Sequence, residues 1–226
     1  MSGIDVTLGE HVVLLGETGS GKTETFKRQF MPKLRRLLIV DSEERQFNDI
    51  PELRRNDGHK VARVIPRDLT KGFRWRVVPP PTRADGIQYL EDLMEGLVNR
   101  WSGEALGKMA VYIDEGTDFS DAHSIGEWFG AAFRKLRKRE VSIFIATQRP
   151  QGLSKWAEGN ATHELIHFVR PFDRKYLGKL WPGLETEIEA IPYRTREQWP
   201  PHDAFPGRPA FLYIGQSGEI VPYLPA

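Results

Sequence analysis

The sequence contains no cysteine among its 226 residues. A disulfide framework, a thiolate metal site and a cysteine nucleophile are therefore excluded, and a reducing compartment suits the chain. Net charge is almost absent as well, because 32 Lys and Arg residues oppose 31 Asp and Glu residues. Overall charge therefore gives no sign of a polyanionic partner, and such a partner would need a local concentration of basic residues.

Long hydrophobic runs are also missing. The longest, at residues 12–15 and 37–40, fall far below the roughly 18 apolar residues of a membrane span. Acidic residues lie near the start of the sequence, where a secretory signal would need basic ones. We therefore expect a chain without a membrane span, folded as one large domain.

Short runs rich in Val, Ile and Leu alternate with longer amphipathic stretches, which is typical of a parallel sheet covered by helices. The expected strands are residues 6–8, 12–15, 37–40, 61–65, 109–113, 141–146 and 165–169. The expected helices are residues 22–30, 84–101, 123–137 and 174–180. Residues 1–191 form the expected main domain, and residues 192–226 form a proline-rich segment and a C-terminal β-hairpin packed on it.

A glycine-rich loop separates the expected strand 12–15 from the helix that follows. Its residues are Gly16, Glu17, Thr18, Gly19, Ser20, Gly21, Lys22 and Thr23. They fit the pattern GxxxxGK[ST], in which backbone N–H groups and a helix N-terminus surround phosphate oxygens. Lys22 would reach the β- and γ-phosphates, and Thr23 would offer its hydroxyl to Mg²⁺. The alternative is a glycine-rich turn with a surface lysine.

Two acids end the expected strand 109–113. Asp114 would hold the water shell of Mg²⁺, and Glu115 would polarise a water for attack on the γ-phosphate. The structural alternative is that the pair caps the next helix. Gln148 follows the expected strand 141–146 and would contact the γ-phosphate or the attacking water. By itself, it could simply close a strand before a turn.

Three segments together resemble a known family: GETGSGKT at 16–23, VYIDE at 111–115 and ATQRP at 146–150. They are similar to the FtsK–HerA branch of the additional-strand, RecA-like P-loop ATPases, and ATQRP is the most specific of them. The strand that ends at Asp41 also resembles HerA-like members. Without membrane spans or extra domains, the chain is most similar to the genome-packaging ATPases of tailless, internal-membrane-containing double-stranded DNA viruses.

The resemblance implies a mainly parallel central sheet and an ATP-hydrolysing enzyme that translocates double-stranded DNA without sequence preference. It implies a homo-oligomeric ring, a hexamer by comparison, that packages a viral genome into a preformed capsid. A capsid or membrane-vertex protein would be a partner. The expected location is the cytoplasm, that of the host if the chain is viral, with the protein docked on or carried in the virion.

In this family an arginine from a neighbouring subunit completes each ATP site. The basic cluster at residues 134–139 precedes the expected strand 141–146, and Arg137 is our choice for this role. Arg134 and Arg139 remain alternatives. A solvated face at the end of a helix is the structural interpretation of the same cluster.

DNA contacts are less visible in the sequence. The candidates are Arg67, Lys71, Arg74 and Arg76, and the loop around Lys155 and Trp156. Alternation over residues 73–77 is also typical of a half-exposed edge strand, and we favour that interpretation for Trp75.

Other functions stay open: a filamentous-phage-type assembly or secretion ATPase, a cellular HerA-like translocase, or a small-molecule kinase. A kinase would need an acceptor pocket and an arginine-rich lid, and these motifs are not its pattern. A guanine-specific switch is disfavoured because no NKxD motif occurs. His163 and His167 lie four residues apart without a third ligand nearby in sequence, so they do not predict a zinc site.

Overall fold

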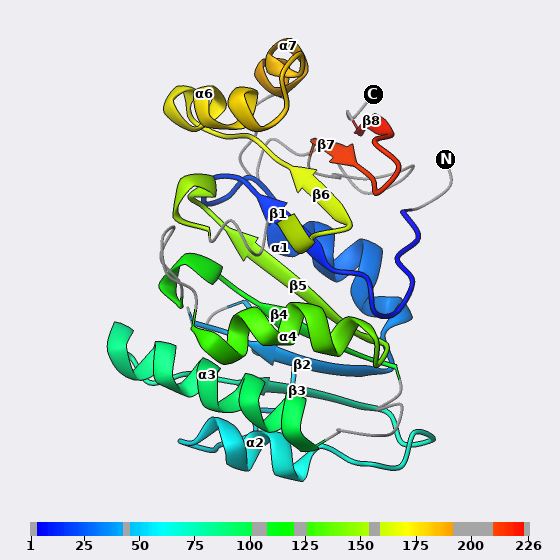
Figure 1. Ribbon diagram of the computed structural model, residues 1–226, viewed down its shortest axis with the longest axis vertical. Coiled ribbons are helices and arrows are strands. Elements are labelled where there is room, and N and C mark those ends of the chain that lie inside the picture. Colours follow the sequence, from blue (N-terminus) through cyan, green and yellow to red (C-terminus); the bar gives the residue numbers. More distant parts are fainter. Residues whose placement is uncertain are drawn as a thin grey trace.

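One sheet organises the molecule. The computed structural model describes residues 4–42, 46–100, 108–119, 126–153, 159–191 and 210–223, and within them eight strands pair in the order β3-β2-β4-β5-β1-β6-β7-β8 (Figure 1). The strands are β1 (Val12–Leu15), β2 (Arg36–Val40), β3 (Phe73–Val77), β4 (Met109–Ile113), β5 (Val141–Thr147), β6 (His163–Ile166), β7 (Phe211–Ile214) and β8 (Ile220–Tyr223). The first six are parallel to one another, β7 pairs with β6 in the antiparallel sense, and β8 pairs with β7 in the antiparallel sense.

Helices cover both faces of this sheet. They are α1 (Lys22–Thr25), which continues as a π-helical turn (Phe26–Phe30), α2 (Gly58–Val64), α3 (Arg83–Arg100), α4 (Glu127–Arg137), α6 (Pro171–Leu180) and α7 (Glu185–Glu189). In Figure 1, α3 and α4 cross in front of the sheet, α2 lies beside α3, and α6 and α7 lie at the opposite end of the molecule. The sheet is therefore an inner layer between two helical layers.

Alternate residues of each parallel strand point into two different cores. Val13 and Leu15 of β1 join the core formed with α2, α3 and α4. Val12 and Leu14 join the second core, which contains Phe26 of the π-helical turn. Both faces are apolar because both are covered, which explains the continuous apolar runs in the sequence. The predicted fold class, a mainly parallel sheet flanked by helices with a C-terminal hairpin, is confirmed.

Two predicted strands are wrong. Residues 61–65 fall in and after α2, because the Asp57 carboxylate caps this helix by accepting the Lys60 N–H at 3.2 Å. Val61 and Ile65 then share one buried face at helical spacing, and an apolar run this short fits either a helix or a strand. Residues 6–8 lead into a turn at Gly9, whose φ of +98° lies in the left-handed region.

The two ends of the sheet agree with the remaining expectations. β3 is an edge strand, as the alternation around Trp75 predicts. The hairpin β7–β8 extends the sheet beyond β6, while the proline-rich residues 192–209 lie outside the described residues. The domain boundary at residue 191 stays a prediction. No helix in the described part of the chain combines the length and the apolar character needed to cross a membrane.

Candidate active site

Three neighbouring strands bring the polar segments of the three motifs together. β5 lies between β4 and β1, and all three are parallel with matched ends: Leu15 pairs with Thr147, and Ile113 pairs with Ile145. The residues that follow these strands therefore meet at the carboxyl edge of the sheet, where open α/β sheets bind ligands. The glycine-rich loop, the acidic pair and Gln148 are assembled in this way.

The glycine-rich loop is anchored on both sides. The Gly16 N–H donates to the Thr147 carbonyl at 3.1 Å, and the Glu17 N–H donates to the Phe168 carbonyl at 2.9 Å. Gly16 has a φ of +151°, and a Cβ there would lie 2.6 Å from the His167 Cβ and 2.7 Å from the Ser20 Oγ. Only glycine fits this position, so the pattern's first glycine has a packing role here.

Lys22 is held inside its own loop. Its side chain is buried, and its Nζ donates to the Gly16 carbonyl at 2.6 Å and to the Glu17 carbonyl at 3.0 Å. Both acceptors belong to the loop, so a short swing would take the ammonium to an anion held by the loop. Glu17 in turn forms an ion pair with Arg170, just before α6.

Asp114 and Thr23 face the same buried hydroxyl. The Tyr112 Oη lies 3.1 Å from the Asp114 Oδ1 and 3.5 Å from the Thr23 Oγ1. Burial, together with the charge of Asp114, raises the pKa of Tyr112 well above its usual value, so the phenol keeps its proton. The sequence reasoning missed Tyr112. Its spacing two residues before Asp114 was the available signal, because alternate strand residues share a face.

Glu115 fastens the end of β4 to the end of β5. Its carboxylate accepts hydrogen bonds from the Thr147 hydroxyl at 3.1 Å, from the Gln148 N–H at 3.1 Å and from the Thr117 hydroxyl. Its φ of +50° is left-handed, a conformation that costs a non-glycine residue free energy and that Lys108 and Glu140 also adopt. Gln148 therefore contacts Glu115 through its backbone.

A buried imidazole lies directly behind the loop. His167 is fully buried, and its ring nitrogens form no hydrogen bond of normal geometry with the described residues, although the Ser20 backbone lies near enough to oppose the lowering of its pKa. Burial and the nearby Lys22 ammonium lower its pKa to about 3, so the ring is neutral. His163 lies at the other end of β6 and bonds Tyr213 and Glu10. The two histidines therefore belong to different parts of the structure.

The three candidate arginines of the basic cluster lie far from this edge. They follow or end α4, where β5 begins, and the seven residues of β5 separate that end from the carboxyl edge by about 20 Å. Arg139 bonds the Val98 carbonyl within the chain, while Arg134 and Arg137 are exposed. Arg137 borders a pocket of about 460 Å³ together with Trp181 and Ile220. None of the three can reach the site of its own chain.

The candidate DNA contacts separate into two groups. Arg76 is buried and pairs with Asp41 and Glu52, and Arg74 donates to backbone carbonyls, so both have structural roles. Arg67 and Lys71 are exposed. Lys155 and Trp156 lie outside the described residues.

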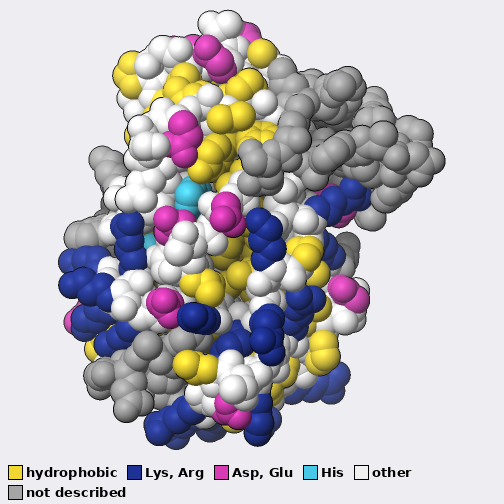
Figure 2. Space-filling view, turned by 90° about the vertical axis from the view of Figure 1, so that its right-hand side faces the viewer, with side chains coloured by type: hydrophobic (Ala, Val, Ile, Leu, Met, Phe, Trp, Pro, Cys, Tyr) yellow, Lys and Arg dark blue, Asp and Glu magenta, His cyan; other side chains and the backbone are white. Residues whose placement is uncertain are grey.

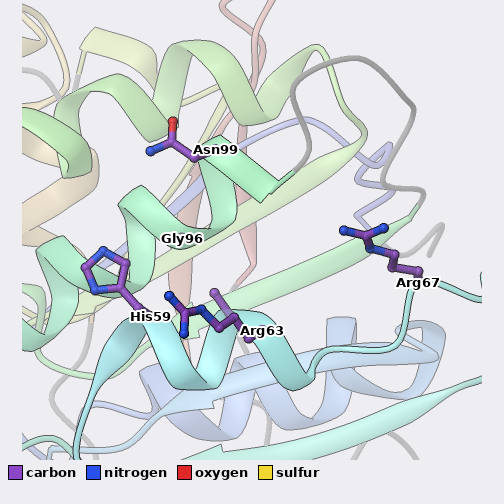
Figure 3. Close-up of a pocket in the computed structure, with 6 residues that line it drawn as sticks. His59, Arg63, Arg67, Gly96 and Asn99 are labelled. Atoms are coloured by element: carbon purple, nitrogen blue, oxygen red, sulfur yellow. The ribbon is translucent and has the colours of Figure 1, made fainter.

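A basic pocket adds one residue to the exposed group. It measures about 470 Å³, and Figure 3 shows Arg63 on α2, Arg67 on the segment that follows α2, and Asn99 on α3. His59 also lines it, but its ring faces the carboxylates of Asp92 and Glu95. Figure 2 shows that Lys and Arg side chains are spread over the half of the displayed face toward α2 and β3, and are scarce toward α6 and α7.

A glycine-rich phosphate loop after β1, an acidic pair after β4 and a polar strand end between them define the fold of a P-loop NTPase. Neither a known family profile nor a curated protein sequence matches the chain. Solved structures do.

The genome-packaging NTPase B204 from Sulfolobus turreted icosahedral virus 2, in complex with sulfate, has a TM-score of 0.71 and 15% identity, over 98% of each chain. The DNA-packaging ATPase B204 from Sulfolobus Turreted Icosahedral Virus has a TM-score of 0.67 and 17% identity, over 98% of this chain and 100% of that one. VirB4 of Thermoanaerobacter pseudethanolicus has a TM-score of 0.60 and 12% identity, over 98% of this chain and 97% of that one. The chain therefore shares its fold with these NTPases, as the motifs predict.

Proposed function

We propose that the chain is an ATP-hydrolysing motor that translocates double-stranded DNA and packages a viral genome into a preformed capsid. The assembly of the phosphate loop, the acidic pair and Gln148 at one sheet edge carries this proposal. The fold supports it, because it is similar over nearly its whole length to a genome-packaging NTPase that has also been solved with AMPPCP and with ATP-gammaS.

The phosphate loop would bind the triphosphate of ATP. Its backbone N–H groups and the start of α1 offer partial positive charge, and Lys22 would exchange two loop carbonyls for phosphate oxygens. Because Lys22 is buried in the loop, a charge-assisted contact there is stronger than one on the surface.

The residues present fit Mg²⁺. The Thr23 Oγ1 and the Asp114 Oδ1 both face the Tyr112 hydroxyl, and a hydroxyl plus a carboxylate, with waters, is the kind of oxygen set that Mg²⁺ takes. When bound, the ion would neutralise charge that develops on the phosphates. Thr23 would hold it directly and Asp114 through water.

Glu115 would orient the attacking water and accept its proton. Of the contacts among described residues, Oε1 receives Thr117, Thr147 and Gln148, while Oε2 receives only the shared Gln148 N–H. Oε2 is therefore the oxygen that can accept a hydrogen bond from a water with the smallest loss of existing hydrogen bonds. Gln148 would place its amide side chain near the γ-phosphate.

Completion of the site would need a second subunit. Arg137 is exposed and lies at the opposite end of β5 from its own phosphate loop, so it would serve the ATP site of a neighbour in a homo-oligomeric ring. Six subunits, and a capsid or membrane-vertex protein as docking partner, complete the proposal.

Arg63 and Arg67 would contact the phosphates of DNA. Replacing both with alanine should weaken duplex binding equally for all sequences and reduce the slope of log affinity against log salt by about two. Fluorescence anisotropy with a labelled duplex across a salt series measures this slope. The matched control is Lys175→Ala with Lys179→Ala, which removes the same charge from α6. Equal slopes in both double variants would show that Arg63 and Arg67 do not contact DNA.

The test of function itself is ATP turnover measured with double-stranded DNA, single-stranded DNA and no nucleic acid. Stimulation by the duplex alone is the expected result. Turnover indifferent to nucleic acid would overturn the translocase proposal and leave an assembly or secretion ATPase. A phosphorylated small-molecule product would instead identify a kinase.

A further inference from the structure

Tyr112 occupies the space between the two residues proposed to hold Mg²⁺. It is fully buried in β4, and its ring stacks on Phe26 with centroids 4.0 Å apart and planes at 28°. Phe26 directly follows α1, the helix that contains Thr23. The tyrosine therefore links β4 to the phosphate-loop helix by packing as well as by its hydroxyl.

The hydroxyl can make only one donation. Its two neighbours are the Asp114 Oδ1 at 3.1 Å and the Thr23 Oγ1 at 3.5 Å. A carboxylate is the stronger acceptor, so the Tyr112 proton goes to Asp114. The Tyr112 oxygen then accepts the proton of the Thr23 hydroxyl, which leaves a Thr23 lone pair facing away from the tyrosine.

We propose that Tyr112 is a positioning residue for the metal side of the nucleotide site. Before nucleotide binds, Tyr112 orders the series of hydrogen bonds that runs from Thr23 through Tyr112 to Asp114. It fixes the carboxylate of Asp114 and turns a lone pair of Thr23 toward the place of the ion. The inference rests on the proposed ATP site. It gives a role there to Tyr112, which lies in the segment at 111–115 but has no role in the chemistry expected of the three motifs.

Removal of the Tyr112 hydroxyl should raise the Mg²⁺ concentration needed for tight nucleotide binding. The nucleotide affinity measured without metal should stay the same. Tyr112→Phe keeps the ring and its stack on Phe26. Binding of a fluorescent ATP analogue in EDTA should match wild type within twofold. The Mg²⁺ concentration that gives half of the metal-dependent tightening should rise about tenfold, which corresponds to 1.4 kcal/mol.

The matched control is Tyr89→Phe. Tyr89 is also buried, its hydroxyl has no hydrogen-bond partner among the described residues, and it belongs to α3, away from the loop. This variant should leave both binding curves unchanged. In a Thr23→Ala background, the effect of Tyr112→Phe should shrink at least threefold, because one of its two contacts is already lost.

An unchanged Mg²⁺ requirement in Tyr112→Phe would overturn the inference, as would an equal loss of affinity with and without Mg²⁺, which marks a packing role only. If wild type binds no nucleotide, the proposed function fails instead. If Tyr112→Phe does not fold, the ultraviolet difference spectrum of the tyrosines in the wild-type protein tests the inference instead. Addition of Mg²⁺ to the nucleotide complex must change it, and Thr23→Ala must abolish that change.

Discussion

Replacement of Glu115 by glutamine separates the chemistry of this residue from its structural contacts. Gln keeps one carbonyl oxygen, which can take the place of Oε1 and retain Thr117, Thr147 and Gln148 as donors. The new NH₂ group replaces Oε2, so the shared half of the Gln148 N–H bond and the negative charge are lost, and an N–H donor then faces the Gln148 N–H. We therefore expect a loss of about 1 kcal/mol in the free energy of unfolding.

For a domain of this size, that loss lowers the melting temperature by about 2–4 °C. ATP affinity should stay within a fewfold of wild type, whereas turnover should fall by about 10² to 10⁴, the contribution typical of a general base. Steady-state phosphate release, nucleotide anisotropy and calorimetry on one preparation give the three quantities. Glu187→Gln, an exposed carboxylate of α7, is the matched control. Wild-type turnover in Glu115→Gln would refute the base, and an unfolded variant would refute the hydrogen-bond account.

Two further predictions concern the far end of the sheet. Arg137→Ala subunits mixed into wild-type rings should lower ATP turnover more steeply than their proportion, and a linear decline in a mixing series would contradict action in a neighbour. His11 accepts the Ile143 N–H and donates to the Phe133 carbonyl, and burial lowers its pKa to about 4. Below pH 6.5 the unfolded chain takes up a proton that the folded chain refuses, so the free energy of unfolding falls by about 1.4 kcal/mol per pH unit until about pH 4. Urea unfolding at pH 7 and pH 5 should show a fall that is about 2 kcal/mol larger in wild type than in His11→Asn, because the buried His167, whose pKa is lowered to about 3, contributes to the fall in both proteins.

The site was predictable where short sequence patterns encode the chemistry. The phosphate loop needs glycine at Gly16 for a contact visible only in the fold, yet the spacing alone identified it. The meeting of Glu115 with Gln148 followed from the rule that parallel strands end at one edge. The roles of these site residues in catalysis stay predictions.

What the sequence could not supply was the outcome of competing contacts. Residues 61–65 read as a strand until the Asp57 cap and the packing of α2 on α3 decide for a helix. Tyr112 read as one apolar strand residue among others, because nothing in a linear pattern shows that its hydroxyl meets Thr23. Arg76 looked available to DNA until Asp41 and Glu52 engage it.

The placement of Arg137 has a consequence for symmetry. One subunit would offer the arginine from the edge where β5 begins and receive its neighbour's arginine at the edge where β5 ends. Donor and acceptor surfaces are then different patches at opposite ends of β5, so a two-fold dimer could complete both sites only if a single interface spanned both patches. Head-to-tail contacts join one patch directly to the other, and such contacts either close into a ring or continue as a filament. In either arrangement all subunits point the same way, so an assembly built through Arg137 in this manner would have a polarity.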